Sequence, residues 1–336
     1  MTARPPAAAA RPVELAPLRR RAVVTGAAGF IGSHLCELLL SNGWQVLGVD
    51  SFTDYYARAD KQANLRAPLA EPRFSFVEAD LAGDGWPQAL RGGDTVFHLA
   101  AQPGVRGSFG ESFARYARDN VICTQRVFEA ASAAGCRRVV WASSSSVYGE
   151  STSHPCREDG ARRPRSPYGA TKRACEDLAD IYRDGGLPIT GMRYFTVYGP
   201  RQRPDMALRR ICEALVAGRP FTLYGDGFQS RDFTYVADAC EATYRAALVA
   251  DPAPVYNVGG GEEATLLRIV AVLERLLGRQ LDLERVGAER GDVRRTAADV
   301  TLASRSLGWK PAVDLETGLA RQLDWVRARR DRRSVA

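Results

Sequence analysis

A glycine-rich turn near the start of the 336-residue chain restricts the possible folds more than any other feature. The apolar run Ala22–Thr25 predicts a buried strand, and Gly26, Gly29 and Gly32 follow it. Apolar residues at helical spacing come next and stop at Asn42–Gly43, which predicts a helix that ends there. Glycines at this spacing allow a tight turn and close approach of the backbone to a phosphate, and the helix start offers free N–H groups. The segment therefore predicts the phosphate-binding opening of a doubly wound α/β fold.

An acidic residue stands where a bound dinucleotide would present its ribose. Asp50 ends the second expected strand, 18 residues beyond Gly32. A carboxylate there binds ribose hydroxyls and repels the extra phosphate of NADP, so it favours NAD. Asp80 and Leu81 end the third expected strand and are candidates for the adenine edge, although a turn aspartate explains Asp80 nearly as well. The candidate cofactor-binding residues in this part are Gly26, Gly29, Phe30, Ile31, Gly32, Asp50, Asp80, Leu81, Leu99, Ala100 and Ala101.

Short apolar runs alternate with amphipathic segments as far as about residue 195. The runs are continuously apolar, which indicates parallel strands that are buried on both faces and separated by helices. We therefore expect a Rossmann-type doubly wound parallel sheet. The expected strands are Ala22–Thr25, Gln45–Val49, Phe74–Val77, Thr95–Leu99, Arg138–Ala142 and Pro188–Phe195, with long helices over Phe113–Ala134 and Ser166–Asp184.

The chain changes character after about residue 195. Gly, Pro, Arg and Tyr become dense, the expected strands shorten, and late helices are expected over Leu266–Leu277 and Leu315–Arg327. This pattern predicts a smaller, mostly carboxy-terminal α/β domain for substrate. The expected division is a disordered leader at 1–20, a cofactor domain at 21–195 with about 232–255, and a substrate domain at 196–231 and 256–330.

Composition and charge exclude several classes of protein. Hydrophobic residues make up 45% of the chain and charged residues 25%, as in ordinary globular proteins, and no apolar run is long enough to span a membrane or to form a secretory signal. The net charge of +7 comes mainly from scattered arginines, because lysine occurs only at Lys61, Lys172 and Lys310. A nucleic-acid-binding protein would need a clustered basic face or a reading motif. We expect a few arginines to meet an anionic small molecule and the rest to be solvated.

Cysteine usage indicates a reducing compartment. The seven cysteines are an odd number and no two form a Cys-x-x-Cys pair, which argues against a disulfide framework and against a metal site. Several stand in apolar stretches, where a thiol packs as a small hydrophobic group. We therefore expect a cytoplasmic protein without a metal.

A tyrosine and a lysine stand four residues apart on an expected helix. Tyr168 and Lys172 therefore project from one face. A phenol is a poor base at neutral pH, but a neighbouring ammonium and a positively charged nicotinamide favour its phenolate. Tyr168 is thus a candidate general base and acid. The alternative is a packed tyrosine beside a solvated lysine, and the scarcity of lysine argues against it.

Polar and basic residues follow the later strands. Four serines, Ser143 to Ser146, come after the fifth expected strand, where doubly wound sheets place ligands. They predict a polar ligand, a plain loop being the alternative. Residues 193–206 and 224–233 mix arginines with glycines and aromatic residues. This mixture suits a nucleoside diphosphate, although a solvated surface position is the alternative for any single arginine.

Four segments together resemble the extended short-chain dehydrogenase/reductase superfamily of nucleotide-sugar epimerases and dehydratases. They are TGAAGFIG at 25–32, FHLAAQ at 97–102, the serine run and YGATK at 168–172, and the resemblance runs from about residue 21 to about residue 310. It implies a tightly bound NAD that is regenerated in every cycle, and catalysis by Tyr168 and Lys172, which also contact the cofactor. Ser144 aligns with the residue that shares the substrate hydroxyl with the tyrosine.

Within the superfamily, the segments RYFTVYGPRQRPDMA and AAQPGVRGS are most similar to UDP-glucuronate 4-epimerases. Related dehydratases and glucuronate decarboxylases usually have Glu at the position of Ser146, and UDP-galactose epimerases typically have Asn at that of Thr196. At Thr296, galactose epimerases often have a larger residue. The resemblance thus implies an isomerase that converts UDP-glucuronate into UDP-galacturonate. It would act through a 4-keto intermediate, with hydride returned from NADH.

The resemblance also implies the residues that bind substrate. Arg231 corresponds to a diphosphate-binding arginine and Asp292 to a residue near the uridine ribose, while the hydroxyls of Thr196 and Ser144 to Ser146 would receive a sugar carboxylate. The expected substrate-binding residues are Arg106, Ser144, Ser145, Ser146, Tyr168, Thr196, Arg203, Gln229, Arg231 and Asp292.

Three other functions stay open at this stage. A UDP-glucose/galactose 4-epimerase would use the same chemistry on a neutral sugar, and a UDP-glucuronate decarboxylase is disfavoured by Ser146. An NAD-binding regulator would have a broken catalytic set, whereas Ser144, Tyr168 and Lys172 are all present. By resemblance, the two long helices pair across a homodimer, and burial in the core is the alternative for their apolar faces.

Overall fold

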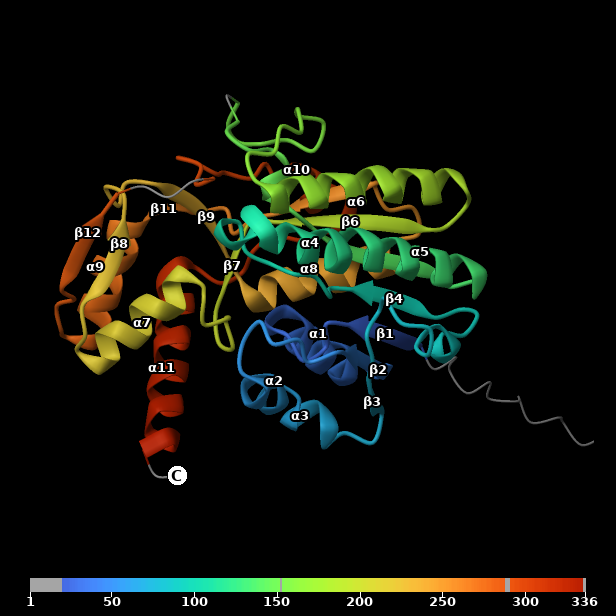
Figure 1. Cartoon of the computed structure of the whole chain (residues 1–336), viewed down its shortest axis with the longest axis horizontal. Helices are drawn as coiled ribbons and strands as arrows, with labels where there is room; N and C mark the ends of the chain where they lie inside the picture. Colours follow the sequence, from blue (N-terminus) through green and yellow to red (C-terminus); the bar gives the residue numbers. More distant parts are fainter. Residues whose placement is uncertain (1–19, 152, 288–290, 335–336) are drawn as a thin grey trace, which may run out of the picture.

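The computed structural model describes residues 20–151, 153–287 and 291–334. At its centre lies a seven-stranded sheet whose neighbouring strands all run parallel (Figure 1). The strand order β3-β2-β1-β4-β5-β6-β10 changes direction between β1 and β4, as in a doubly wound fold. This confirms the expected Rossmann-type sheet. Its strands are β1 (Arg21–Thr25), β2 (Gln45–Asp50), β3 (Phe74–Glu78), β4 (Thr95–His98), β5 (Arg138–Ser144), β6 (Ile189–Tyr194) and β10 (Val255–Val258).

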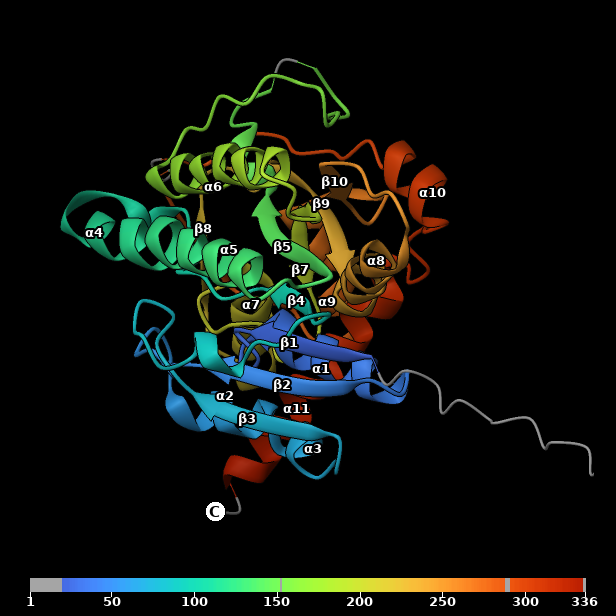
Figure 2. The same cartoon turned by 90° about the vertical axis from the view of Figure 1, so that its right-hand side faces the viewer.

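Helices cover both faces of this sheet, which explains why its strands are apolar on both sides (Figure 2). On one face lie α1 (Phe30–Ser41) and α8 (Val236–Leu248), and on the other α5 (Cys123–Ala133) and α6 (Pro167–Asp184). The first core contains Leu35, Leu39, Phe97, Ala239 and Ala246, and the second contains Val96, Val127, Phe128, Cys175 and Ala179. Two short helices, α2 (Arg58–Asn64) and α3 (Arg66–Leu69), connect β2 to β3.

A smaller part with short strands lies beside the large sheet, on the left in Figure 1. A three-stranded sheet and a parallel pair of strands form it, together with helices over 207–217, 266–277 and 315–334. The expected helix over 266–277 is confirmed, and the last helix continues beyond its expected end to Ser334. The elements are β7 (Thr196–Tyr198), α7 (Ala207–Ala217), β8 (Phe221–Tyr224), β9 (Ser230–Tyr235), β11 (Glu263–Thr265), α9 (Leu266–Leu277), β12 (Leu283–Val286) and α11 (Leu315–Ser334). The helix α10 (Thr301–Leu307) packs instead against α8 and β10 of the large part (Figure 2).

One expected helix is interrupted, and one late segment of the chain returns to the large sheet. The expected helix over 113–134 consists of α4 (Phe113–Tyr116), a π-helix over Ala117–Ile122 and then α5. The segment expected to return to the large sheet, about 232–255, corresponds to α8 and β10, and β10 ends at Val258 beside β6. The chain thus passes from the large sheet to the smaller part and back.

Several expectations concern the ends and the cysteines. Residues 1–19 of the expected leader lie outside the described residues. Within the described ranges, no helix combines the length and apolar character that a membrane crossing needs. All seven cysteines are buried thiols, as small apolar residues of a core would be.

Candidate active site

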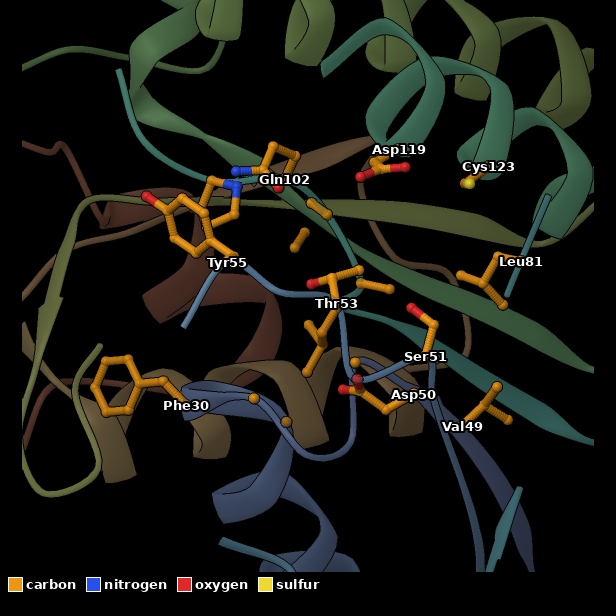
Figure 3. Close-up of a pocket in the computed structure, with 18 of the residues that line it drawn as sticks. Phe30, Val49, Asp50, Ser51, Thr53, Tyr55, Leu81, Gln102, Asp119 and Cys123 are labelled. Atoms are coloured by element: carbon orange, nitrogen blue, oxygen red, sulfur yellow. The ribbon is translucent and has the colours of Figure 1, made fainter. Parts of the chain in front are cut away.

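A cavity of about 540 Å³ opens at the carboxyl ends of β1, β2, β4 and β5 (Figure 3). This is the edge at which doubly wound sheets bind their ligands. Asp50, Ser51 and Thr53 follow the β2 loop along it, with Tyr55 and Leu81 at opposite ends. All the residues expected to bind cofactor line it: Gly26, Gly29, Phe30, Ile31, Gly32, Asp50, Asp80, Leu81, Leu99, Ala100, Ala101, Tyr168 and Lys172.

The glycine turn is packed too closely for side chains. Gly26 has a φ of +71°, and a Cβ there would lie 2.8 Å from the backbone nitrogen of Ala100. A Cβ on Gly32 would lie 2.1 Å from the carbonyl oxygen of Gly26. The helix α1 starts directly after Gly29, so its first N–H groups face the cavity. This cradle has the shape and the free donors that a pyrophosphate needs.

The Asp50 carboxylate is fixed at the end of β2. It accepts hydrogen bonds from the backbone N–H of Ala28 at 3.1 Å and of Phe52 at 2.8 Å. Burial raises the pKa of this carboxyl above its ordinary value, although these N–H donors and Lys61 oppose the rise. The carboxylate thus joins the glycine turn to the β2 loop, where a ribose would lie.

Lys61 is a cavity residue that the sequence analysis did not single out. Its ammonium donates to the carbonyl oxygen of Thr53 at 2.7 Å and to the Thr53 hydroxyl at 3.0 Å, and the side chain is buried. The signal was present in the sequence, because Lys61 is one of only three lysines. Two of the three therefore line this cavity.

At the other end of the cavity, Asp80 is paired with Arg118 from the π-helix. Its carboxylate also accepts the Ala82 N–H at 2.9 Å. Burial disfavours the ionised form, but the Ala82 and Arg118 donors outweigh it and hold the pKa of Asp80 below its ordinary value. Arg118, Asp119 and Cys123 line this end together with Asp80 and were not expected from the sequence.

Tyr168 and Lys172 enter the cavity from the first turns of α6. Ser166 caps this helix by accepting the Gly169 N–H, and Pro167 occupies its first position, as helix starts favour. Lys172 is 3% exposed and donates to the carbonyl oxygen of Ala142 at 2.8 Å. The pair therefore projects from one helix face, as expected, and its lysine is bound to the end of β5.

The π-helix brings Asn120 against the start of α6. The Asn120 amide donates to the Thr171 hydroxyl at 2.9 Å and to the carbonyl oxygen of Gln102 at 3.1 Å, and its oxygen accepts the Gln102 N–H at 2.7 Å. This buried amide joins the β4 loop to the residue before Lys172. Apolar periodicity cannot distinguish a π-turn from an α-turn, so no sequence signal marked Asn120.

The expected substrate-binding residues fall into two groups. Tyr168 and Arg203 line the cavity, whereas the other eight do not. Among those eight, Asp292 pairs with Arg106 at 2.8 Å and lies 3.7 Å from Arg231. The Arg106 guanidinium also stacks on Tyr224, 4.3 Å from the ring centroid, and the backbone carbonyl of Tyr224 accepts the Gln229 amide at 3.0 Å.

The remaining four expected residues lie at the end of β5 and the start of β7. Ser144 ends β5 and its hydroxyl accepts the Ser146 N–H at 3.1 Å. Ser145 and Ser146 begin the following 3₁₀ turn, and Thr196 begins β7. The nearby Thr296 hydroxyl is buried and has no hydrogen-bond partner among the described residues.

His98 fixes the strand that leads into the glycine turn. Its Nδ1 lies 2.8 Å from the Thr25 hydroxyl and its Nε2 2.9 Å from the Thr124 hydroxyl. Burial lowers the pKa of His98 to about 3. Burial, assisted by Arg201, lowers the pKa of His34 to about 4. Both imidazoles are therefore neutral in the folded protein at pH values where an unfolded histidine is charged.

The contribution of the two histidines to stability is expected to increase with pH between about 4.5 and 6. The two histidines contribute stability that is present above pH ~6.5 and is lost as the pH falls toward their folded values. Burial raises the pKa of Asp232 to about 6, so Asp232 contributes in the opposite sense, and its contribution is lost as the pH rises through 6. Unfolding exposes the two imidazoles, and each takes up about one proton in this window, which contributes ~1.4 kcal/mol per pH unit for each histidine.

The variant His98→Gln tests this account by urea unfolding across that pH window. It removes one of the two protons taken up, so the slope of the unfolding free energy against pH is expected to fall by ~1.4 kcal/mol per unit. Equal slopes for variant and wild type would contradict the buried, neutral state of His98.

The fold and cavity together define a class of protein. The chain is a Rossmann-type dinucleotide-binding protein that presents a tyrosine and a buried lysine inside its cofactor cavity. The profile of the NAD dependent epimerase/dehydratase family matches residues 22–259, and the chain belongs to that family.

Individual relatives are similar over nearly the whole chain. A protein of Bacillus subtilis (strain 168) named as an uncharacterized UDP-glucose epimerase, YtcB, is 41% identical over 309 residues, 90% of this chain and 97% of the relative. The UDP-glucuronate 4-epimerase of Thermodesulfobacterium geofontis (strain OPF15) is 37% identical over 90% of this chain and 95% of its own length. The crystal structure of UDP-glucuronic acid 4-epimerase from Bacillus cereus, in complex with UDP-glucuronic acid and NAD, superposes with a TM-score of 0.89 at 39% identity, covering 92% of this chain and 99% of that one.

Proposed function

We propose that this protein is an NAD-dependent UDP-sugar 4-epimerase, and that its substrate is UDP-glucuronate, which it converts into UDP-galacturonate. The observation that carries the proposal is that Tyr168, Lys172 and Arg203 line the same cavity as the glycine turn and Asp50. A proton-transferring pair and an anion-binding group therefore lie next to a dinucleotide site. Relatives of 37% to 41% identity that are named for such epimerases support the choice of reaction.

NAD is held by the cavity residues. The turn from Gly26 to Gly32 and the start of α1 bind the pyrophosphate, Asp50 binds the adenosine ribose, and Asp80 and Leu81 flank the adenine. Ala100, Ala101, Tyr168 and Lys172 face the nicotinamide half. When bound, NAD supplies an acceptor and donor of hydride for sugar carbon 4.

Tyr168 moves the proton. Its phenolate takes the proton from the hydroxyl on sugar carbon 4 as that carbon is oxidised, and it returns the proton to the same oxygen when the carbon is reduced on the other face. The Lys172 ammonium, held by the carbonyl oxygen of Ala142 at 2.8 Å, favours the phenolate by its charge. Ser144 shares the substrate hydroxyl with Tyr168.

The sugar carboxylate has to survive the oxidised stage. With glucuronate, the 4-keto intermediate is a β-keto acid, which readily loses carbon dioxide. The hydroxyls of Ser144, Ser145, Ser146 and Thr196 bind the carboxylate and fix its orientation. Because residue 146 is a serine, the site lacks the Glu that related decarboxylases usually have at this position. Arg106, Arg203, Gln229, Arg231 and Asp292 bind the UDP part.

Specificity constants for two substrates test the choice of sugar. We expect kcat/KM to be higher for UDP-glucuronate than for UDP-glucose. In Thr196→Val it should fall by roughly tenfold or more for UDP-glucuronate and remain nearly the same for UDP-glucose, because a hydrogen bond to a charged group contributes about 1.5–3 kcal/mol. A higher kcat/KM for UDP-glucose would contradict the proposed substrate.

A UDP-glucose/galactose 4-epimerase is the second candidate. The name of the Bacillus subtilis relative favours it, as does the structure of MoeE5 with UDP-glucose and NAD, whose chain is 40% identical over 94% of this one. MoeE5 has also been solved with UDP-glucuronic acid. The comparison of specificity constants separates the two candidates.

We also propose that the active form is a homodimer. Phe113, Ile122 and Ile181, in α4, the π-helix and α6, are 43%, 51% and 66% exposed, and such apolar side chains suit contact with a second copy. Sedimentation equilibrium distinguishes dimer from monomer.

The two parts of the fold have different proposed roles. Residues 21–195 with about 232–255 would bind NAD, and residues 196–231 and 256–330 would bind the sugar nucleotide in a soluble, cytoplasmic enzyme.

A further inference from the structure

Tyr55 lies where three loops at the carboxyl edge of the sheet meet. It belongs to the loop after β2 and lines the cavity (Figure 3). Its hydroxyl donates to the Asp205 carboxylate at 3.1 Å, across 150 positions of sequence. A Cβ on Gly104, also in the β4 loop, would lie 2.8 Å from that hydroxyl. The ring therefore crosses from the β2 loop past the β4 loop to the loop after β7.

Asp205 connects Tyr55 to Arg203, one of the residues expected to bind substrate. Its carboxylate accepts two hydrogen bonds from the Arg203 guanidinium, at 3.1 and 3.2 Å, while also accepting the Tyr55 hydroxyl. Arg203 lines the cavity as Tyr55 does. One carboxylate thus joins the loop that follows Asp50 to the loop that carries Arg203.

Two other contacts of the β2 loop come from the large part of the fold. The Lys61 ammonium donates two hydrogen bonds to Thr53, at 2.7 and 3.0 Å, and the exposed Asp54 pairs with the exposed Arg115 at 3.0 Å. Such a surface pair contributes little to order. The Tyr55 contact is, within the described residues, the hydrogen bond that joins the loop to the smaller part of the fold.

We propose that Tyr55 and Asp205 form a strap that closes over the bound dinucleotide and slows its release. Ser51, Thr53 and Tyr55 line the cavity, so outward movement of this loop would widen it, and the hydrogen bond between Tyr55 and Asp205 opposes that movement. The inference rests on the proposed function only in that NAD occupies the cavity. An enzyme that regenerates its cofactor within each turnover gains from slow release, since an empty site is inactive.

The test is the rate at which bound NAD leaves the holoenzyme. Protein loaded with radiolabelled NAD is mixed with excess unlabelled NAD, and retained label is followed with time. Tyr55→Phe removes one hydroxyl and is expected to raise the release rate about tenfold, equivalent to ~1.4 kcal/mol. Asp205→Ala should raise it likewise, and the double variant should release NAD no faster than Asp205→Ala alone, because the two side chains act through one contact.

Asp54→Asn is the matched control. Asp54 belongs to the same loop, but its side chain is exposed, does not line the cavity and pairs with the exposed Arg115. Its release rate should equal that of wild type. Unchanged release from Tyr55→Phe, equally fast release from Asp54→Asn, or fully additive effects in the double variant would overturn the strap. Release is measured without sugar nucleotide, so failure of the strap and failure of the proposed epimerisation are seen in separate experiments.

Discussion

Replacing Tyr168 by Phe is expected to lower kcat on the order of 10³-fold while leaving the protein folded and able to bind NAD. The change removes only the phenol oxygen. No hydrogen bond from this oxygen to another described residue holds the fold, and the ring keeps its edge contact with Tyr116, whose centroid is 6.3 Å away. The expected fall in kcat therefore reflects the loss of proton transfer alone. Steady-state turnover, thermal unfolding and NAD content measure the three quantities separately.

Tyr116→Phe is the control for removing a neighbouring phenol. Its hydroxyl donates to the carbonyl oxygen of Pro103 at 2.9 Å, and Tyr116 does not line the cavity. Loss of one such hydrogen bond contributes ~1 kcal/mol, so kcat should change by less than about tenfold. Near-normal turnover by Tyr168→Phe would remove Tyr168 from the catalytic role.

Removing Glu176 is expected to have the largest effect on stability. Glu176 and Arg193 are 5% and 3% exposed and form two hydrogen bonds, at 2.7 and 2.9 Å. Glu176 also accepts the Ser143 hydroxyl at 2.6 Å, and Arg193 donates to the Tyr148 hydroxyl at 2.6 Å. Glu176→Ala leaves a buried guanidinium without its carboxylate. The unfolding free energy should fall by about 3–5 kcal/mol, measured by urea unfolding.

The adjacent residue supplies a matched control. Asp177 stands on the same helix and pairs with Arg162 at 3.0 Å, but half of its side chain is exposed. Surface pairs contribute about 0–1 kcal/mol, so Asp177→Ala should lose no more than that. Equal losses in the two variants would show that burial of the Glu176–Arg193 pair is unimportant.

Sequence reasoning succeeded where the signal is local. The strand, glycine turn and helix at 22–43 follow from short-range sterics, because a Cβ on Gly26 or Gly32 would collide with neighbouring backbone. The spacing of Tyr168 and Lys172 fixes their common helix face without knowledge of the rest of the chain.

Contacts between distant segments could not be predicted in this way. Arg106 and Asp292 are 186 positions apart and Tyr55 and Asp205 are 150 apart, so only the folded chain shows that they meet. The return of the chain to the large sheet near residues 232–255 was expected, but the pairing of β10 with β6 was not, because apolar periodicity does not report which strand edge is free. Lys61 is an intermediate case: the sequence shows that lysine is rare in this chain, but it does not show that Lys61 is buried.

Product analysis of the wild-type protein tests the central proposal most directly. The purified protein is given UDP-glucuronate without added NAD, and the sugar nucleotides are separated by chromatography and identified by proton NMR. We expect UDP-galacturonate with the carboxylate retained, formed by cofactor that was purified with the protein. Formation of a UDP-pentose, or conversion of UDP-glucose together with no conversion of UDP-glucuronate, would contradict it.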